Sequence, residues 1–500
     1  MKDFEKIILG IDIGTTATKG ILLDPSKGVI ASEEVPSALI SQKTGWAEED
    51  PNEWWKNVAK VTQKCLNQIG ASSKSIISIG VSGMVPTLIL LDGKGSVLRP
   101  SIQQNDARAV KEIDDFKQRF DETEVLNKTG SPISQQSIGP KLNWLRFNEK
   151  DKFNAMKKVC GSYDYIVYKL TSQHVCERNW ALESGLFDVK KECWDKDILD
   201  YCGISEMNLG KVSWPATIVG EVSADAAKET GLCAGTAVVA GSADHIASAF
   251  SAGISKPGDM LVKLGGAGDI LCCLDNLEVD ERLFLDYHVI PGLYLINGCM
   301  ATSGSIIKWF RENLAGDFDY GELETKGENI PAGSEGLVLL PYFLGEKTPI
   351  NDPKARGMLM GLTLHHKQEH IYRAILEGIS FGFLHHINVF KELNISPNSA
   401  RLTNGGARSR LWKKITADVL EIPVEVVSNH PGSSLGAAFI AGKATGVFSS
   451  WEEIDRFIEI GETIDPDPEV SEIYKELFCI YREIYKRNKD VFEKLWEIST

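Results

Sequence analysis

An acidic residue at a predicted strand-to-helix junction is the first candidate for chemistry. Residues 238–240 are typical of the end of a buried strand, Gly241 interrupts it, and Asp244 begins a helix predicted through Ile246 and Ala249. Backbone N–H groups of a first helical turn favour the ionised form of a carboxylate placed there. An isolated aspartate at such a junction is most often an N-cap, so this interpretation stands beside a catalytic one.

A glycine turn follows this junction. Residues 260–264 and 270–274 are predicted strands, and the turn between them, 265–268, carries no bulky side chain. Because glycine has no Cβ, backbone N–H groups can crowd an anionic ligand at such a turn.

The same pattern occurs at the start of the chain. Strands predicted at 7–11 and 19–24 flank a polar turn that runs from Asp12 to Thr16. Either unit alone could be an ordinary hairpin, but together they predict a duplicated architecture. Each half would then contribute one phosphate-binding hairpin.

Composition and charge limit the class of protein. Five hundred residues exceed what one hydrophobic core usually supports, so we expect two domains. The 43% apolar and 25% charged residues are typical of a globular protein. A net charge of −15 argues against a nucleic-acid partner and attracts no anionic substrate, so an ATP site must be local and cation-assisted.

Export and membrane insertion are not indicated. The N-terminus enters a predicted strand at once, unlike a signal peptide, and no apolar run approaches about 18 residues. The cysteines show no metal-ligand spacing, and several (Cys65, Cys233, Cys299 and Cys479) lie in apolar contexts typical of core thiols. We expect a cytoplasmic protein.

The surrounding elements would position these groups. A predicted strand at 76–82 ends in the loop 83–86, and α/β proteins bind ligands at such strand ends. The small-residue segment 180–185 could approach a ligand. The turn at Gly405 and Gly406 and the helix start at 432–438 could form a slot for a flat ring.

Two polar groupings leave alternatives open. Asp106 and Arg108 could be a surface ion pair of small energetic worth or hydrogen-bonding groups of a sugar pocket, and the ion pair is favoured. His366 and His370 stand at i, i+4 with Glu369 beside them. This spacing could bind a metal, but solvated histidines at a helix start are favoured because no third ligand is evident.

In their order along the chain, these motifs resemble the FGGY carbohydrate kinases, most closely the xylulokinase-like branch. The match extends from about Ile7 to Val447. It rests on Asp12-Ile-Gly-Thr-Thr with Lys19, Gly45-Trp46 through Trp54-Trp55, Pro100 to Arg108, Leu170-Thr171, Ala240 to Asp244, Gly336 to Glu346, Arg356-Gly357, Glu377-Gly378, Gly405-Gly406-Ala407 and Leu435 to Ala438.

The resemblance implies a role for each matching residue. Asp244 matches the catalytic base that takes the proton of the sugar hydroxyl, and Asp12 matches the residue that positions Mg²⁺, usually through water. ATP would be bound by Thr15, Thr16, Lys19, Gly265, Gly266, Gly304, Gly405, Gly406 and Gly436. The sugar would be bound by Met84, Val85, Gln104, Asp106 and Asp244. Phosphoryl transfer needs these functions: positioned phosphates, a cation and an oriented nucleophile.

Three positions depart from the family pattern. Gly266-Ala267 stands where the second phosphate loop usually carries a hydroxyl, so only backbone donors remain there. Pro86 replaces a histidine that resembles a sugar ligand, and Gln104 replaces a tryptophan. The last two fall in the expected sugar pocket, so the sugar need not be D-xylulose.

The sequence therefore predicts an α/β fold of two actin-like (ribonuclease-H-like) domains, residues 1–246 and 247–500, around a cleft. We expect an ATP- and Mg²⁺-dependent kinase that phosphorylates a ketopentose at a terminal hydroxyl. A kinase for another polyol or sugar acid, such as L-ribulose, gluconate or glycerol, is the first alternative. An actin-like ATPase switch is the second. No nucleic-acid or membrane partner is expected, and a homodimer is left open.

Overall fold

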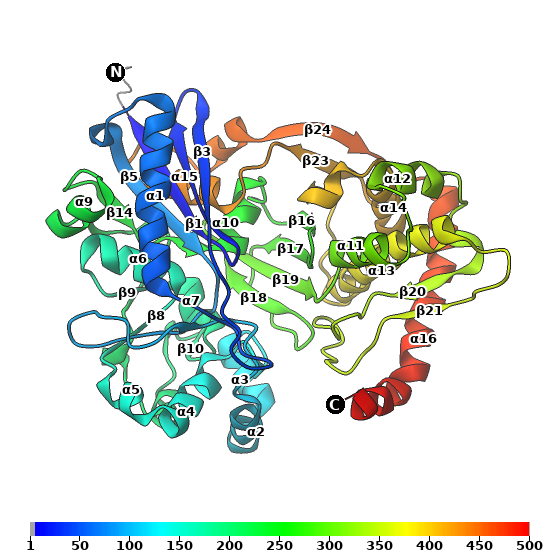
Figure 1. The fold of residues 1–500 in the computed structure, drawn as a ribbon, viewed down its shortest axis with the longest axis horizontal. Coiled ribbons are helices and arrows are strands. Elements are labelled where there is room, and N and C mark those ends of the chain that lie inside the picture. Colours follow the sequence, from blue (N-terminus) through cyan, green and yellow to red (C-terminus); the bar gives the residue numbers. More distant parts are fainter. Residues whose placement is uncertain (1–5, 500) are drawn as a thin grey trace.

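The computed structural model describes residues 6–499, which form two seven-stranded sheets with helices around them (Figure 1). Within that range, no helix has the length and apolarity needed to cross a membrane. The sheets occupy opposite sides of the molecule in Figure 1, and the long C-terminal helix α16 lies on the side of the second sheet.

The first sheet has the order β13-β14-β5-β1-β2-β3, and β15 also pairs with β5. Strands β14, β5 and β1 are parallel, whereas β1, β2 and β3 form an antiparallel meander. Its strands are β1 (Ile7–Ile13), β2 (Ala17–Asp24), β3 (Gly28–Pro36), β5 (Ile76–Gly83), β13 (Ile218–Glu221), β14 (Ala237–Val239) and β15 (Ser242–Ala243).

The second sheet has the order β18-β19-β17-β16-β22-β23-β24. It repeats the pattern of the first, because β16 pairs antiparallel with β17 on one side and parallel with β22 on the other. Its strands are β16 (Asp259–Leu264), β17 (Gly268–Leu274), β18 (Phe284–Tyr287), β19 (Tyr294–Met300), β22 (Ser399–Thr403), β23 (Val424–Ser428) and β24 (Glu459–Ile464). The repeated arrangement confirms the duplicated architecture predicted from the two hairpins.

Helices pack on both sheets, and short two-stranded ribbons complete the fold. The helices of the first half are α1 (Pro51–Ile69), α2 (Val110–Arg119), α3 (Glu122–Thr129), α4 (Ile138–Asn148), α5 (Lys150–Ala155), α6 (Ser162–Thr171), α7 (Arg178–Glu183), α8 (Lys196–Cys202), α9 (Ala224–Thr230) and α10 (Asp244–Ser251). Those of the second half are α11 (Gly304–Asn313), α12 (Tyr320–Glu328), α13 (Gln368–Glu392), α14 (Arg410–Leu420), α15 (Ser433–Ala444) and α16 (Pro468–Ser499). The ribbons are β4 (Glu48–Glu49) with β7 (Ser101–Ile102), β6 (Ile89–Leu91) with β8 (Lys158–Cys160), β9 (Val175–Glu177) with β12 (Lys211–Ser213), β10 (Phe187–Asp188) with β11 (Cys193–Trp194), and β20 (Val338–Leu340) with β21 (Met358–Met360).

Helix α15 belongs to the second half by sequence but packs on the first sheet, against β1 and β5, and against α10. The approach is close: a Cβ added to Gly10 would lie 2.1 Å from the Ser434 carbonyl oxygen, and one added to Gly80 would lie 1.9 Å from that of Ala437. Glycine is required at both strand positions. The division at residue 246 stays a prediction.

Candidate active site

Asp244 is the first residue of α10, and Ala243 takes the N-cap position. The N-cap interpretation is therefore wrong. The side chain of Asp244 is 38% exposed, and its Oδ1 accepts a hydrogen bond of 2.6 Å from the backbone N–H of His245. A carboxylate at this position is held near the helix N-terminus and still opens into a cavity.

Strand pairing brings Asp12 and Asp244 to the same place. Ser82 of β5 pairs with Asp12 of β1 on one side and with Ser242 of β15 on the other. Asp244 follows Ser242 by two residues, so both carboxylates lie at the carboxyl end of β5. This is the strand end at which the sequence predicts ligand binding.

The environment of Asp12 fits a bound cation. Burial, together with the negative charge of Asp244, raises the pKa of Asp12 to about 6, although Ser433 and Ser82 donate hydrogen bonds to it and Lys19 lies near. The Ser82 hydroxyl donates to Asp12 Oδ1 at 2.9 Å. Carboxylate oxygen is a preferred ligand of Mg²⁺, and a divalent cation would offset the charge of two neighbouring carboxylates.

Asp244 opens into a cavity of about 160 Å³. Two other predicted sugar ligands, Val85 and Gln104, line it as well. The remaining lining residues are Gln136, Glu183, His245, Lys263, Asp269, Leu271, Phe284, Asn297, Cys299 and Lys347. We call this space the acceptor cavity. A further cavity of about 360 Å³ shares Gln104, Gln136, Phe284 and Lys347 with it, so the two adjoin.

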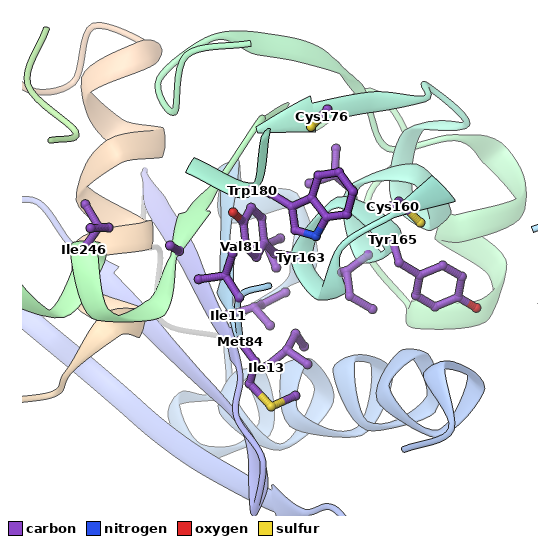
Figure 2. Packing of buried hydrophobic residues seen from close by; sticks show 14 of the residues in the cluster. Ile11, Ile13, Val81, Met84, Cys160, Tyr163, Tyr165, Cys176, Trp180 and Ile246 are labelled. Atoms are coloured by element: carbon purple, nitrogen blue, oxygen red, sulfur yellow. The ribbon is translucent and has the colours of Figure 1, made fainter. Parts of the chain in front are cut away.

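Met84 and Asp106 do not line the acceptor cavity. Met84 is 2% exposed and lies in the core of the first half with Ile13 and Val81 (Figure 2), and the Thr15 hydroxyl contacts its sulfur at 3.0 Å. Asp106 accepts from the Ala47 N–H and from the Arg108 guanidinium. Both side chains are held by the protein itself, and their assignment as sugar ligands stays a prediction.

The ion pair of Asp106 and Arg108 is confirmed, but it is not on the surface. Both side chains are fully buried, and Arg108 Nη2 lies 2.7 Å from both Asp106 and Glu48. Although burial opposes the charged form, Arg108 lowers the pKa of Asp106. The Arg108 guanidinium also stacks 3.8 Å above the Trp46 ring, so this pair holds the loop that carries Gln104.

A cavity of about 800 Å³ lies on the second domain. Five of the glycines predicted to bind ATP line it, namely Gly265, Gly266, Gly304, Gly405 and Gly406. Its walls include the aromatic rings of Tyr320, Tyr372 and Trp412. A large cavity with flat apolar walls and exposed backbone suits a nucleotide base and its phosphates.

Gly436 lies elsewhere, within α15. A Cβ at this position would be 2.2 Å from the Ala247 carbonyl oxygen of α10. The residue lets two helices approach closely, and its assignment to the adenosine pocket stays a prediction. At the start of α15, Ser433 donates a hydrogen bond to Asp12.

The two phosphate hairpins differ in what they present. Thr15, Thr16 and Lys19 are exposed around the β1–β2 turn, and Lys19 pairs with Asp12 across the hairpin. The β16–β17 turn lies against the start of α11, where the Gly304 N–H donates to the Gly265 carbonyl at 2.8 Å.

A hydroxyl, that of Ser305, lies close to the turn at Gly266 and Ala267. The Ser305 hydroxyl donates to the Gly266 carbonyl at 2.9 Å, and Ser305 lines the nucleotide cavity.

Several residues of the acceptor cavity carry no sequence motif. Two of them are His245 and Glu183, to which no role is assigned from the sequence. Lys263 forms an ion pair of 2.9 Å with Asp269 across the β16–β17 hairpin. Although burial opposes the charged form of each group, the pair raises the pKa of Lys263 and lowers that of Asp269. Lys263 thus places a cation between the acceptor cavity and the glycine turn of the nucleotide cavity.

Cys299 also lines this cavity, and burial with the nearby Asp269 raises the pKa of its thiol to about 12. The expectation of a core thiol is wrong for Cys299, and also for Cys479, which is exposed.

The histidines at the start of α13 are hydrogen-bonded. His366 Nδ1 and His370 Nδ1 accept from the backbone N–H groups of Thr363 and Lys367. His370 is buried, which contradicts the expectation that it is solvated. A third polar group is present after all: Glu335 lies 2.7 Å from His365 and 3.5 Å from His370. Glu335, His365 and His370 therefore bring one possible ligand atom each to within 4.8 Å of one another, which the spacing of His366 and His370 did not predict.

Comparison with known proteins agrees with this geometry. A family model described as the FGGY family of carbohydrate kinases, N-terminal domain, matches residues 7–251, and the corresponding C-terminal model matches 281–445. The chain is 30% identical to the xylulose kinase of Bacillus subtilis over 97% of this chain and 98% of the relative. It is 28% identical to the gluconokinase of the same species over 95% and 94%.

Solved structures show the same fold. The xylulose kinase from Rhodospirillum rubrum superposes with a TM-score of 0.92 at 40% identity, covering 98% of this chain and 100% of that one. The gluconate kinase from Lactobacillus acidophilus superposes with a TM-score of 0.92 at 28% identity, covering 98% and 99%.

Proposed function

The chain belongs to the FGGY family of carbohydrate kinases, and from that premise we propose that it phosphorylates a ketopentose at a terminal hydroxyl, with Asp244 as the general base. The protein is a xylulokinase-like, ATP-dependent carbohydrate kinase with two actin-like domains. The sugar and the residue roles are the proposed part.

The observation that carries the proposal is the position of Asp244. It lines the acceptor cavity and shares a strand end with Asp12 and the first phosphate hairpin. A hydroxyl bound in that cavity would be within reach of a base and of a phosphate held by the glycine turns. Phosphoryl transfer depends on this placement more than on covalent chemistry.

The transfer would proceed in one displacement. The acceptor oxygen forms a bond to the γ-phosphorus, the bond from that phosphorus to the bridging oxygen of ADP breaks, and the hydroxyl proton passes to the carboxylate of Asp244. Lys19 and the backbone N–H groups around Gly265 and Gly266 would hold the phosphates. Asp12 would hold Mg²⁺, which when bound neutralises charge on the phosphate oxygens.

A sugar acid is a second candidate because of Lys347. Its Nζ lies 3.8 Å from Cys299 Sγ, and the residue lines both the acceptor cavity and the adjoining cavity. The carboxylate of an aldonate could pair with this ammonium group. The gluconokinase relatives are consistent with this candidate.

A coupled ADP-release screen over ketoses, polyols and aldonates tests the proposal. We expect the highest kcat/KM with a ketopentose. An aldonate preference that Lys347→Gln reverses would select the sugar acid instead. If ADP release were equally fast without any acceptor, the site would be a nucleotide switch and the proposal would be wrong.

A further inference from the structure

His245 joins the proposed base to a buried carboxylate. Its Nδ1 lies 3.5 Å from Asp244 Oδ1, and its Nε2 lies 3.2 Å from Asp286 Oδ2. Nε2 is also 3.8 Å from Glu183 Oε1. Both ring nitrogens therefore face carboxylate oxygens, and an imidazole can donate from both only when it is protonated.

Asp286 is fixed in place. It is fully buried on β18 and accepts a hydrogen bond from the Asn297 amide of the neighbouring strand β19. Its neighbour Tyr287 is held in turn, because its backbone N–H donates to Asn179 Oδ1 at 2.8 Å and its carbonyl accepts from Asn179 Nδ2 at 2.9 Å. A strand of the second sheet thus anchors a side chain at the start of α10.

The charges around His245 favour the imidazolium. The carboxyl groups facing it are Asp244 on α10, Glu183 on α7 and Asp286 on β18, and Asp269 and Lys263 lie across the cavity as an ion pair. Although burial opposes the charged form, Asp286 and Glu183 raise the pKa of His245 well above its ordinary value. Burial and the neighbouring Asp286 raise the pKa of Glu183 as well, although the charge of His245 opposes that shift.

We infer that His245, fixed by Asp286, is a positioning residue that orients the carboxylate of Asp244 as the base. The inference rests on the proposed function of Asp244. Oδ1 of Asp244 receives the His245 backbone N–H and faces the ring, so Oδ2 is the oxygen left to accept the proton of the acceptor.

The charge of the ring has a definite sign of effect. A protonated ring donates from both nitrogens, so it can bridge Asp286 and Asp244 and hold the Asp244 carboxylate in one orientation. A ring that loses its proton gives up one of these donors, so the orientation of Asp244 is lost as the pH rises through the pKa of His245. Asp286 helps to keep the His245 ring protonated, so a substitution of Asp286 should act through His245.

The test compares His245→Gln and Asp286→Asn with His174→Gln, a control whose ring lies outside both cavities and contacts the Val159 carbonyl. For His245→Gln we expect kcat to fall about tenfold to a hundredfold with the KM for ATP unchanged, because the base is no longer held in one orientation. For Asp286→Asn we expect a new decline toward alkaline pH, because His245 then loses its proton within the assay range. Asp286→Glu, which restores the charge, should recover part of the rate.

Two results would overturn the inference. One is wild-type kcat in both folded variants, with no alkaline decline in Asp286→Asn. The other is a lower kcat with an unmoved profile, which would assign only a structural role. If His245→Gln does not fold, the profile of Asp286→Asn decides. Asp244→Asn distinguishes failure of the proposed function from failure of this inference. Full activity in that variant refutes Asp244 as the base. Loss of activity there, with normal activity in the His245 and Asp286 variants, refutes only the positioning role.

Discussion

The carboxylates of Asp12 and Asp244 flank the carboxyl end of one strand, β5, and burial together with the charge of Asp244 raises the pKa of Asp12 to about 6. The unfolded chain has no such constraint, and Asp12 would titrate near its ordinary value of 3.8 there. Near neutral pH, the ionised carboxylate of Asp12 therefore lowers the stability of the folded protein.

Asp12→Asn should stabilise the protein and remove its activity. A carboxyl whose pKa is raised by folding binds more protons in the folded state, so its destabilising effect is full above about pH 6 and disappears below about pH 4. The variant should therefore gain on the order of 3 kcal/mol of unfolding free energy at pH 7.5. The gain should vanish at pH 4, as measured by urea denaturation at both values. An equal gain at both values would mean that ionisation of Asp12 is not the cause.

Asp244→Asn should lower kcat by roughly two to four orders of magnitude, the range for a positioned general base. Nucleotide affinity, measured by calorimetry with an ATP analogue, should change little because the side chain lines the acceptor cavity. A folded variant that retained more than about a tenth of the rate would exclude the residue as the base.

Gly405→Ala and Gly436→Ala should separate a ligand contact from a packing contact. A Cβ at Gly405 meets nothing within 4 Å and enters the nucleotide cavity, so KM for ATP should rise with the melting temperature unchanged. A Cβ at Gly436 meets the Ala247 carbonyl at 2.2 Å, so the variant should lose about 1–3 kcal/mol of stability. Thermal melts and ATP titrations on both variants test this prediction. A raised KM for ATP with an unchanged melting temperature in Gly436→Ala would support a place for Gly436 in the nucleotide site.

The acceptor preference should depend on Gln104. Its amide lines the acceptor cavity, and its Oε1 lies 3.4 Å from the Gln136 amide, so Gln104→Ala should weaken the sugar more than ATP. A site that hydrogen-bonds one hydroxyl discriminates strongly when that hydroxyl is inverted. We therefore expect a ketose other than D-xylulose to be preferred, or weak selectivity among pentuloses.

Pro86 borders a small neighbouring cavity that shares Glu183 and Gln136 with the acceptor cavity. Pro86→His should move relative kcat/KM toward D-xylulose, because an imidazole could reach the shared wall. Measured kcat/KM values for a panel of pentuloses test both substitutions. A wild-type preference for D-xylulose over every other ketose by more than about a hundredfold would contradict this prediction.

Local patterns were enough to predict both hairpins and the start of α10, whereas the resemblance assigned the glycines that line the nucleotide cavity. Each depends on residues adjacent in sequence, where glycine, strand periodicity and a helix start have direct physical meanings. The resemblance assigned Asp12 and Asp244, and strand pairing places both at one strand end.

Residues brought together from distant strands could not be predicted in the same way. Asp286 and Lys263 stand in ordinary strands, and their roles arise only when β16 and β18 meet the start of α10. Gly436 looked like a ligand-binding glycine because sequence alone does not show which helix packs against it. The contacts of Asp106 were hidden for the same reason, since Ala47, which donates to it, and Glu48, which pairs with its neighbour Arg108, come from another loop.

The packing of α15 on the first sheet has a consequence for how the chain folds during synthesis. Residues 433–444 leave the ribosome long after the strands they cover, and until then β1 and β5 expose glycine-lined backbone on that face. The N-terminal sheet, although translated first, is therefore completed last. A truncated product that ends near residue 246 should be captured by chaperones rather than accumulate as a folded domain.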